Sequence, residues 1–331
     1  MSTEVKPLTG RVAIVAGATR GAGRGMARGL AEAGAIVYCT GRSVKGQPSA
    51  YERLETIDET VEMIAAEGGM AVPVRVDHTV ESEVEALFQR VMREHGRVDV
   101  VVDSVAGEDP VMQQWGHFWE VDVTRGDAVF RQGLISHVLT AKHAARAMMP
   151  ARRGLIVEVT ENDVLGGGGN PFSQVVKIGL KTMALNMATE LRPHDVAAVA
   201  VTPGYLRSES MLEGYGVTET TWREAGRQDS NFLESESPLY LGRGVSALAA
   251  DPNVLERSGQ LLSSWELARH YGVTDYDGRR PDWGAHAIDW SGMPPSLLEY
   301  FQIGWRMQRK WLGALLERTE RYIEKLPAVN A

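Results

Sequence analysis

The chain has a single cysteine, Cys39, among its 331 residues, and it has no apolar run long enough to span a membrane. One cysteine excludes an intramolecular disulfide and a cysteine-based metal cluster, and we expect Cys39 to be a core residue. Positive charge is also scarce, because 35 Lys and Arg residues face 43 Asp and Glu residues. The net charge of -8 argues against nucleic-acid binding. Without an apolar signal segment, the sequence predicts a soluble cytoplasmic protein, and we expect no metal site.

Strand-like apolar runs alternate with helical patterns along most of the chain. The runs cover residues 11–16, 35–40, 71–76, 98–103, 154–160, 196–202 and 259–264. The helical patterns cover residues 21–33, 52–67, 80–95, 126–149, 172–192 and 238–251. Because the runs are continuously apolar, they are typical of parallel strands that are buried on both faces. The sequence therefore predicts a doubly wound, mostly parallel α/β sheet with helices on both faces.

A glycine-rich turn follows the first of these runs. Gly17, Gly21 and Gly23 are spaced G-x-x-x-G-x-G between a strand and a helix. The first turn of a helix offers free backbone N–H groups and the positive end of the helix dipole. Glycines at these positions leave room for a pyrophosphate and for the neighbouring strand. The pattern predicts a dinucleotide-binding βαβ unit.

Several motifs together resemble the short-chain dehydrogenase/reductase family over residues 9–265. The matching pieces are the glycine turn at 16–23 and the segments 76–77, 96–102, 154–157 and 202–204. Within the family, the sequence is most similar to the branch called dehydrogenase/reductase SDR family member 1, through segments 118–120, 258–262, 267–272 and 275–278. The resemblance implies a Rossmann domain over 1–265, with a C-terminal extension over 266–331.

The resemblance also implies which residues bind a nicotinamide dinucleotide. Asp77 and the backbone of His78 would hold the adenine, and Lys177 would hold the nicotinamide ribose. The full set is Gly17, Thr19, Arg20, Gly21, Ala22, Gly23, Arg42, Asp77, His78, Ser104, Ala106, Thr160, Lys177, Pro203, Gly204, Tyr205, Leu206 and Ser208.

The end of the second strand carries the information on cofactor choice. NAD-binding enzymes of this fold usually place an acidic residue there, but residues 38–42 contain none. Arg20 and Arg42 could instead bind a 2′-phosphate, since guanidinium offers charge and a fork of donors. We therefore predict NADP(H) over NAD(H). The alternative is that both arginines are solvated surface residues.

The catalytic positions depart from the family pattern. The Y-x-x-x-K motif falls on Ser173 and Lys177, and no tyrosine lies between Tyr51 and Tyr205. The family's serine position falls on Glu161, and its asparagine position falls on Gly133, while 103–107 departs from the Asn-Asn-Ala-Gly motif. Because a serine hydroxyl is a much weaker acid than a phenol, Ser173 cannot replace the tyrosine as proton donor without help.

Three other side chains are candidates for proton transfer. Glu161 is expected near the nicotinamide, where partial burial would raise its pKa and allow acid–base work. The alternative is an ion pair with Lys177 and no proton transfer. Tyr205 could supply a phenol or could pack on the cofactor. His137 lies on the helix that lines the site, although helix histidines are more often packing or surface residues.

Residues 205–239 take the place of the family's substrate loop. Their mixture of apolar and polar residues suits a lid over a largely apolar ligand, or a surface helix pair that packs its own apolar face. The tail pattern over 296–325 predicts an amphipathic helix. It would pack on its own or a partner subunit, with peripheral membrane contact as the other interpretation. The resemblance implies that the helices at 126–149 and 172–192 pair subunits into a homodimer or homotetramer.

Three functions follow from these features. The first is an atypical NADP(H)-dependent oxidoreductase that acts on a small or medium, largely apolar carbonyl, imine or activated alkene. The second is a non-redox lyase or isomerase that uses Glu161 as base. The third is a catalytically silent NADP(H)-binding protein. Residues Lys177, Ser173 and Glu161 are the catalytic candidates.

Overall fold

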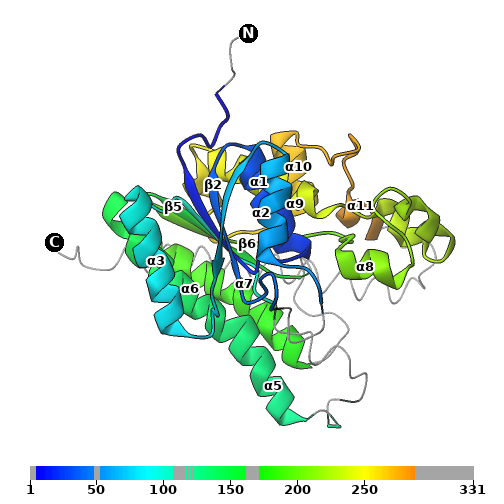
Figure 1. Cartoon of the computed structure of the whole chain (residues 1–331), viewed down its shortest axis with the longest axis horizontal. Helices are drawn as coiled ribbons and strands as arrows, with labels where there is room; N and C mark the ends of the chain where they lie inside the picture. The colour runs from blue at the N-terminus through cyan, green and yellow to red at the C-terminus, as the bar shows by residue number, and fades with distance from the viewer. Residues whose placement is uncertain are drawn as a thin grey trace, which may run out of the picture.

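The computed structural model describes residues 5–47, 53–106, 117, 119–120, 122–161 and 171–287. Within these ranges, one sheet has seven strands in the order β3-β2-β1-β4-β5-β6-β7, and every neighbouring pair is parallel (Figure 1). The strands are β1 (Val12–Ala16), β2 (Ile36–Gly41), β3 (Met70–Arg75), β4 (Val100–Asp103), β5 (Gly154–Val159), β6 (Val196–Thr202) and β7 (Leu261–Ser263). The predicted doubly wound sheet is confirmed.

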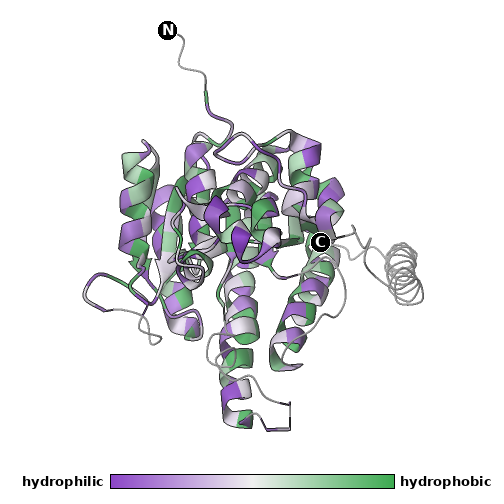
Figure 2. Ribbon diagram, turned by 90° about the vertical axis from the view of Figure 1, so that its right-hand side faces the viewer, coloured by the Kyte–Doolittle hydropathy of each residue, from purple (hydrophilic) through white to green (hydrophobic). Residues whose placement is uncertain are grey.

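Helices cover both faces of the sheet, because alternate side chains of each strand point to opposite faces. Ala13 and Val15 share one core with α1 (Gly21–Glu32), α2 (Ile57–Ala66) and α9 (Pro238–Ala250). Val12 and Ile14 share the other core with three further helices (Figure 1). Those helices are α3 (Glu81–His95), α6 (Ser136–Met148) and α7 (Pro171–Leu191). In Figure 2, hydrophobic and hydrophilic residues alternate along the covering helices, as expected for helices with one buried face.

Two predicted helices differ from their sequence patterns at their starts. The helix expected at 52–67 begins only at Ile57, because Thr56 accepts a hydrogen bond from the Glu59 N–H (3.1 Å) and caps it. The helix expected at 126–149 begins earlier, as α5 (Val123–Phe130), since Asp122 caps its first turn. A π-helical turn, Arg131–Ile135, then joins α5 to α6. Such turns are frequent at functional sites.

The predicted substrate loop forms a small lobe with a core of its own. It contains α8 (Glu209–Gly214) and two 3₁₀ turns, Trp222–Arg227 and Ser230–Glu234. Trp222 and Phe232 are fully buried at its centre, against the partly buried residues Tyr205, Met211, Leu212, Tyr215 and Val217. The apolar residues expected in a lid therefore pack mainly on one another.

The chain beyond the last strand continues as part of the same body. Helix α10 (Ser264–Tyr271) begins with a capping box, and its Leu267 lies in the core beside α9. The domain boundary expected after residue 265 thus falls inside α10. Helix α11 (Trp283–Ala287) follows. The amphipathic tail expected at 296–325 lies outside the described residues.

Two smaller predictions concern the core and the membrane. Cys39 is fully buried in β2, as expected for a core residue. Among the helices that the structure describes, none has the length and hydropathy to cross a membrane.

Candidate active site

The glycine turn after β1 is built by backbone packing that excludes side chains. Gly17 has φ of +77°, and a Cβ there would lie 2.5 Å from the carbonyl oxygen of Ser104. A Cβ on Gly23 would lie 2.2 Å from the carbonyl oxygen of Gly17. Side chains larger than glycine are excluded at both positions, so the first turn of α1 lies directly against Gly17, the residue after β1.

The N-terminus of α1 is the place where the sequence predicts an anion site. The first turn of α1, which lies within the described residues, contains no acidic residue of its own. Its N-cap residue, Arg20, has extended backbone and makes no side-chain cap. These features fit a pyrophosphate, and the turn brings together Gly17, Thr19, Arg20, Gly21, Ala22 and Gly23.

Arg42 lies just beyond the end of β2, where the sequence predicts the 2′-phosphate. Its guanidinium is 41% exposed, with Nη1 3.8 Å from Asp77 Oδ2 and Nη2 3.3 Å from Gln132 Oε1. Burial raises the pKa of Asp77, but hydrogen bonds from Thr79 and the charge of Arg42 outweigh it and lower that pKa. Arg42 and Asp77 therefore lie at the same corner of the site, and the guanidinium is open to a ligand.

The side chain of His78 belongs to the core. Its ring is 3% exposed and lies between the hydroxyls of Thr40 (2.8 Å) and Thr140 (2.9 Å). Burial lowers the pKa of this imidazole. Only the backbone of His78 is left for a cofactor, which is the role that the resemblance implies.

The ends of β4 and β5 bring the next predicted residues together. The Ser104 N–H donates to the carbonyl oxygen of Ala16 (3.0 Å), which holds the Ser104–Ala106 segment beside the glycine turn. Thr160 is 1% exposed, and its Oγ1 donates to the carbonyl oxygen of Lys177 (2.9 Å). This bond joins the end of β5 to α7, so the segment beside β4, Thr160 and Lys177 lie at one edge of the sheet.

The catalytic candidates lie where β5 and α7 meet. Lys177 Nζ is 3.9 Å from Glu161 Oε1, and the two side chains are 13% and 59% exposed. The partial burial expected for Glu161 is not observed, because its side chain is this exposed. The ion pair is the better interpretation. Ser173 is 8% exposed, and its Oγ has no hydrogen-bond partner within the described residues.

The asparagine position and the segment after β6 show two further departures. Gly133 is buried within the π-helical turn. The Tyr205 hydroxyl donates to Asp229 Oδ2 (2.7 Å), and its ring packs on Phe232 and Trp283. Burial and hydrogen bonds with Tyr215 and Asp229 raise the pKa of Tyr205, so its phenol is a poor proton donor. Residues Pro203, Gly204, Leu206 and Ser208 follow β6 and lead into α8.

Comparison with known proteins agrees with this geometry. Residues 11–214 match the short chain dehydrogenase family. The chain belongs to the short-chain dehydrogenase/reductase family. The dehydrogenase/reductase SDR family member 1 of Mus musculus is 37% identical over 306 residues, which cover 91% of this chain and 92% of that protein. The protein of the same name from Homo sapiens is 38% identical over 277 residues, with 82% and 85% covered.

A solved structure extends the comparison to a bound cofactor. A metagenomic short-chain oxidoreductase in complex with NADP is 25% identical and superposes with a TM-score of 0.57. The match covers 75% of this chain and 94% of that one. This short-chain dehydrogenase/reductase therefore has the fold of a nicotinamide-dependent oxidoreductase, and its glycine turn fits that cofactor class.

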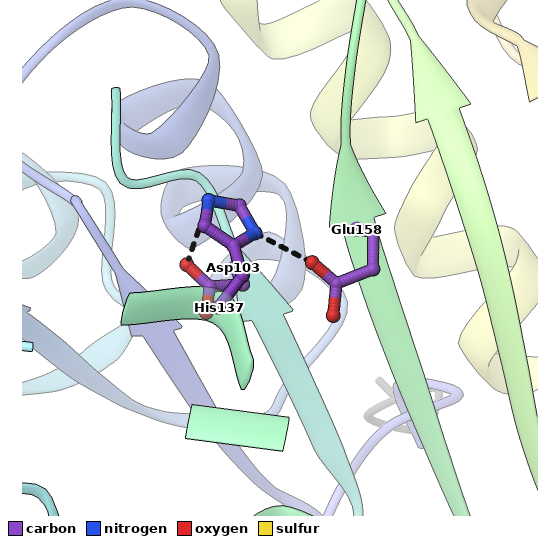
Figure 3. Close-up of side chains that lie close together, drawn as sticks. All are labelled: Asp103, His137 and Glu158. Carbon is purple, nitrogen blue, oxygen red and sulfur yellow. Dashed lines mark hydrogen bonds and ion pairs between the residues drawn. The ribbon is translucent and has the colours of Figure 1, made fainter. Parts of the chain in front are cut away.

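Sequence reasoning missed a buried cluster that this short-chain dehydrogenase/reductase has beneath the site. Asp103 and Glu158 are register partners on β4 and β5, and His137 reaches them from α6 (Figure 3). Each side chain is at most 1% exposed, and one donor atom from each lies within 4.8 Å of the others. The alternation of side chains along a strand could have indicated this cluster. Asp103 follows Val101 by two residues, and Glu158 follows Ile156 by two. Both acids therefore face α6, as those two core residues do.

The geometry of this cluster argues against a metal site. His137 Nδ1 is 2.6 Å from Glu158 Oε2, and Nε2 is 3.5 Å from Asp103 Oδ1. The two carboxylates thus lie at opposite nitrogens of one ring, so an ion bound at either nitrogen would face a single carboxylate. Three converging ligands are the usual minimum for a tight site, and the arrangement favours a protonated histidine between two acids.

Proposed function

We propose that this short-chain dehydrogenase/reductase is an NADP(H)-dependent oxidoreductase with a non-standard active site. The observation that carries the cofactor choice is Arg42, exposed at the end of β2 beside Asp77, in a segment without an acidic residue. A 2′-phosphate would satisfy the guanidinium in bidentate geometry. The NADP complex of the metagenomic relative supports the same choice.

The proposed roles of the catalytic candidates follow from their positions. When bound, a nicotinamide cofactor supplies or accepts a hydride. Lys177, near the end of β5, would hold the nicotinamide ribose through its ammonium. Ser173 stands at the family's tyrosine position, and its Oγ has no hydrogen-bond partner in the part of the chain that the structure describes. This hydroxyl can hold a polar substrate atom but is too weak an acid to protonate it.

The proposed substrate is small or medium in size and largely apolar, with a carbonyl, an imine or an activated alkene at the reacting atom. An iminium ion or an activated alkene needs less acid help than a ketone does, which suits a site without the tyrosine. The exposed Glu161 does not favour the lyase or isomerase alternative, because its carboxylate lies in solvent and pairs with Lys177.

Two measurements test this function. Dissociation constants for NADPH and NADH, taken by fluorescence titration at one salt concentration, should show tighter binding of NADPH. Equal affinity, or tighter NADH, would contradict the cofactor choice. Incubation of the protein and NADPH with a panel of carbonyls, imines and enones should then oxidise NADPH with at least one class. Oxidation with none of the panel would support the silent binding protein.

A further inference from the structure

The ring of His137 makes two hydrogen bonds in the core, one on each nitrogen. Nε2 is 3.0 Å from the carbonyl oxygen of Val105, which can only accept, so Nε2 carries a hydrogen. Nδ1 is 2.6 Å from Glu158 Oε2. Figure 3 shows the ring held between the side chains from β4 and β5. The imidazole is therefore fixed in position and in rotation.

Charged and titratable groups face the ring from each neighbouring strand. Asp103 comes from β4, Glu158 from β5 and His78 from the segment after β3. Burial lowers the pKa of His137, but the two carboxylates outweigh it and raise that pKa to about 9. The two carboxylates thus favour the protonated ring, while burial raises the pKa of Glu158 to about 7.

The carbonyl that accepts from Nε2 belongs to the loop at the end of β4. That loop lies against the glycine turn, because the Ser104 N–H donates to Ala16 and a Cβ on Gly17 would come within 3.0 Å of the Val105 nitrogen. Gly17 thus packs on the peptide between Ser104 and Val105, and His137 bonds to the carbonyl oxygen of the next peptide, between Val105 and Ala106. A displacement of this loop would reach the floor of the anion site directly.

We propose that His137 is a positioning residue for cofactor binding, which acts by holding the Ser104–Ala106 segment against the glycine turn through its bond to Val105. The proposal rests on the proposed function in one respect, that a nicotinamide dinucleotide binds at this turn. Helix α6 supplies the donor, and β5 supplies Glu158, which orients the ring. Asp103 lies on the other side of the ring, with its Oδ1 3.5 Å from Nε2.

Two substitutions of His137 separate its two contacts. In His137→Gln, the amide nitrogen takes the place of Nε2 and can still donate to Val105. In His137→Asn, the shorter amide takes the place of Nδ1 and reaches only Glu158. A matched control is His143→Asn, since His143 is also buried on α6 but stacks on Phe88.

The first measurement needs no cofactor. Hydrogen exchange of the peptides that contain residues 104–106 should be about tenfold faster in His137→Asn than in His137→Gln or His143→Asn, because one hydrogen bond of ordinary strength is lost. The second measurement is the NADPH dissociation constant. We expect it to rise about tenfold in His137→Asn and to stay within about threefold in the other two variants.

The outcomes distinguish this inference from the proposed function. If His137→Asn and His137→Gln exchange and bind alike, the positioning role is overturned. If the wild-type protein binds NADH rather than NADPH, the cofactor choice fails and the same comparison is made with NADH. If it binds neither, the proposed function fails and hydrogen exchange alone decides the role of His137.

A spectroscopic measurement on the wild-type protein covers the case in which His137→Asn does not fold. With isotope-labelled histidine, NMR should show a slowly exchanging Nε2–H signal that is absent in His137→Gln. A ring that carries hydrogen only on Nδ1 could not donate to Val105, and that result would overturn the proposal.

Discussion

The carboxylate of Glu209 accepts a hydrogen bond from the backbone N–H of Gly21, with 2.7 Å between the nitrogen and Oε2. Its other oxygen is 3.1 Å from Arg24 Nη1, and that arginine is 6% exposed. Glu209 begins α8 of the small lobe, whereas Gly21 begins α1. A carboxylate from the lobe thus binds at the N-terminus of α1, where a pyrophosphate is expected.

This contact predicts competition between Glu209 and the cofactor. In Glu209→Gln, we expect NADPH to bind about three- to tenfold more tightly, because a neutral amide neither repels the pyrophosphate nor competes as strongly for the N–H. Isothermal titration at low salt would measure the change. Glu213→Gln is the control, since Glu213 is on the same helix but pairs with Arg53. Weaker binding in Glu209→Gln would mean that Glu209 supports the site through Arg24.

Arg42 gives a prediction about cofactor preference. In Arg42→Ala, NADPH affinity should fall about tenfold or more, because a charge-assisted pair with the 2′-phosphate is lost. NADH affinity should change by less than about twofold. Arg75→Ala is a control, since Arg75 is an exposed arginine of β3 that pairs with Glu83. Equal losses for both cofactors would show that Arg42 does not contact the 2′-phosphate.

The glycine turn and the doubly wound sheet could be predicted because both leave local patterns in the sequence. The strands are continuously apolar, and the glycines stand at fixed spacing before a helix. The Asp103–His137–Glu158 cluster could not, because it depends on the register of β4 against β5 and on the rotation of α6. Alternation places both acids on the α6 face, but it does not say which residue of α6 meets them. The exposure of Glu161 likewise depends on where β5 ends relative to α7.

The departures at Ser173 and Glu161 predict a non-additive pair of substitutions. Ser173→Tyr alone should not restore reduction of simple ketones, because Lys177 already pairs with Glu161, and a nearby carboxylate disfavours the phenolate. The double change Ser173→Tyr with Glu161→Ser should reduce ketones faster than the two single changes predict together. The measurement is the rate of NADPH oxidation.

A matched double variant tests the specificity of that coupling. Glu190→Ser removes an exposed carboxylate near the other end of α7, and with Ser173→Tyr it should behave like Ser173→Tyr alone. Gly133 still lacks the asparagine, so full activity is not expected in any variant. Strong ketone reduction by Ser173→Tyr alone would show that Glu161 does not restrain the phenol.

The exposed apolar side chains of α6 and α7 predict a subunit interface. Val138 on α6 and Val175 on α7 are 46% and 52% exposed, on helices where the family resemblance implies pairing. Val138→Glu should shift the protein toward the monomer in light scattering at micromolar concentration, because a charge in an apolar interface is costly. Met92→Glu on α3 is the control, with a similarly exposed apolar side chain elsewhere. A wild-type monomer would contradict the proposed oligomer.

A buried carboxyl gives the prediction on pH. Glu236 is 1% exposed, and its Oε2 accepts from the Gly204 N–H (3.0 Å) and from Ser264 Oγ (2.5 Å). Burial raises the pKa of Glu236 from its usual 4.5 to about 8, although those hydrogen bonds partly oppose it. The folded protein therefore keeps a proton that the unfolded chain releases. Stability is fully present below pH 4.5, and it falls as pH rises toward 8.

Glu236→Gln should remove this pH dependence without removing the acceptor. The amide oxygen can take both hydrogen bonds, and it does not titrate. Between pH 5 and pH 8.5, the free energy of unfolding should fall by about 1–3 kcal/mol more in the wild-type protein than in Glu236→Gln. Urea unfolding at both pH values measures the difference. Any contribution of His137 and Glu158 to the pH dependence of stability cancels in this difference, because both proteins contain these residues. Glu224→Gln, at an exposed position of the same lobe, is the control. If the wild-type protein and Glu236→Gln lose equal stability over this range, Glu236 is ionised in the folded protein at neutral pH, and its contact with Gly204 is that of a carboxylate.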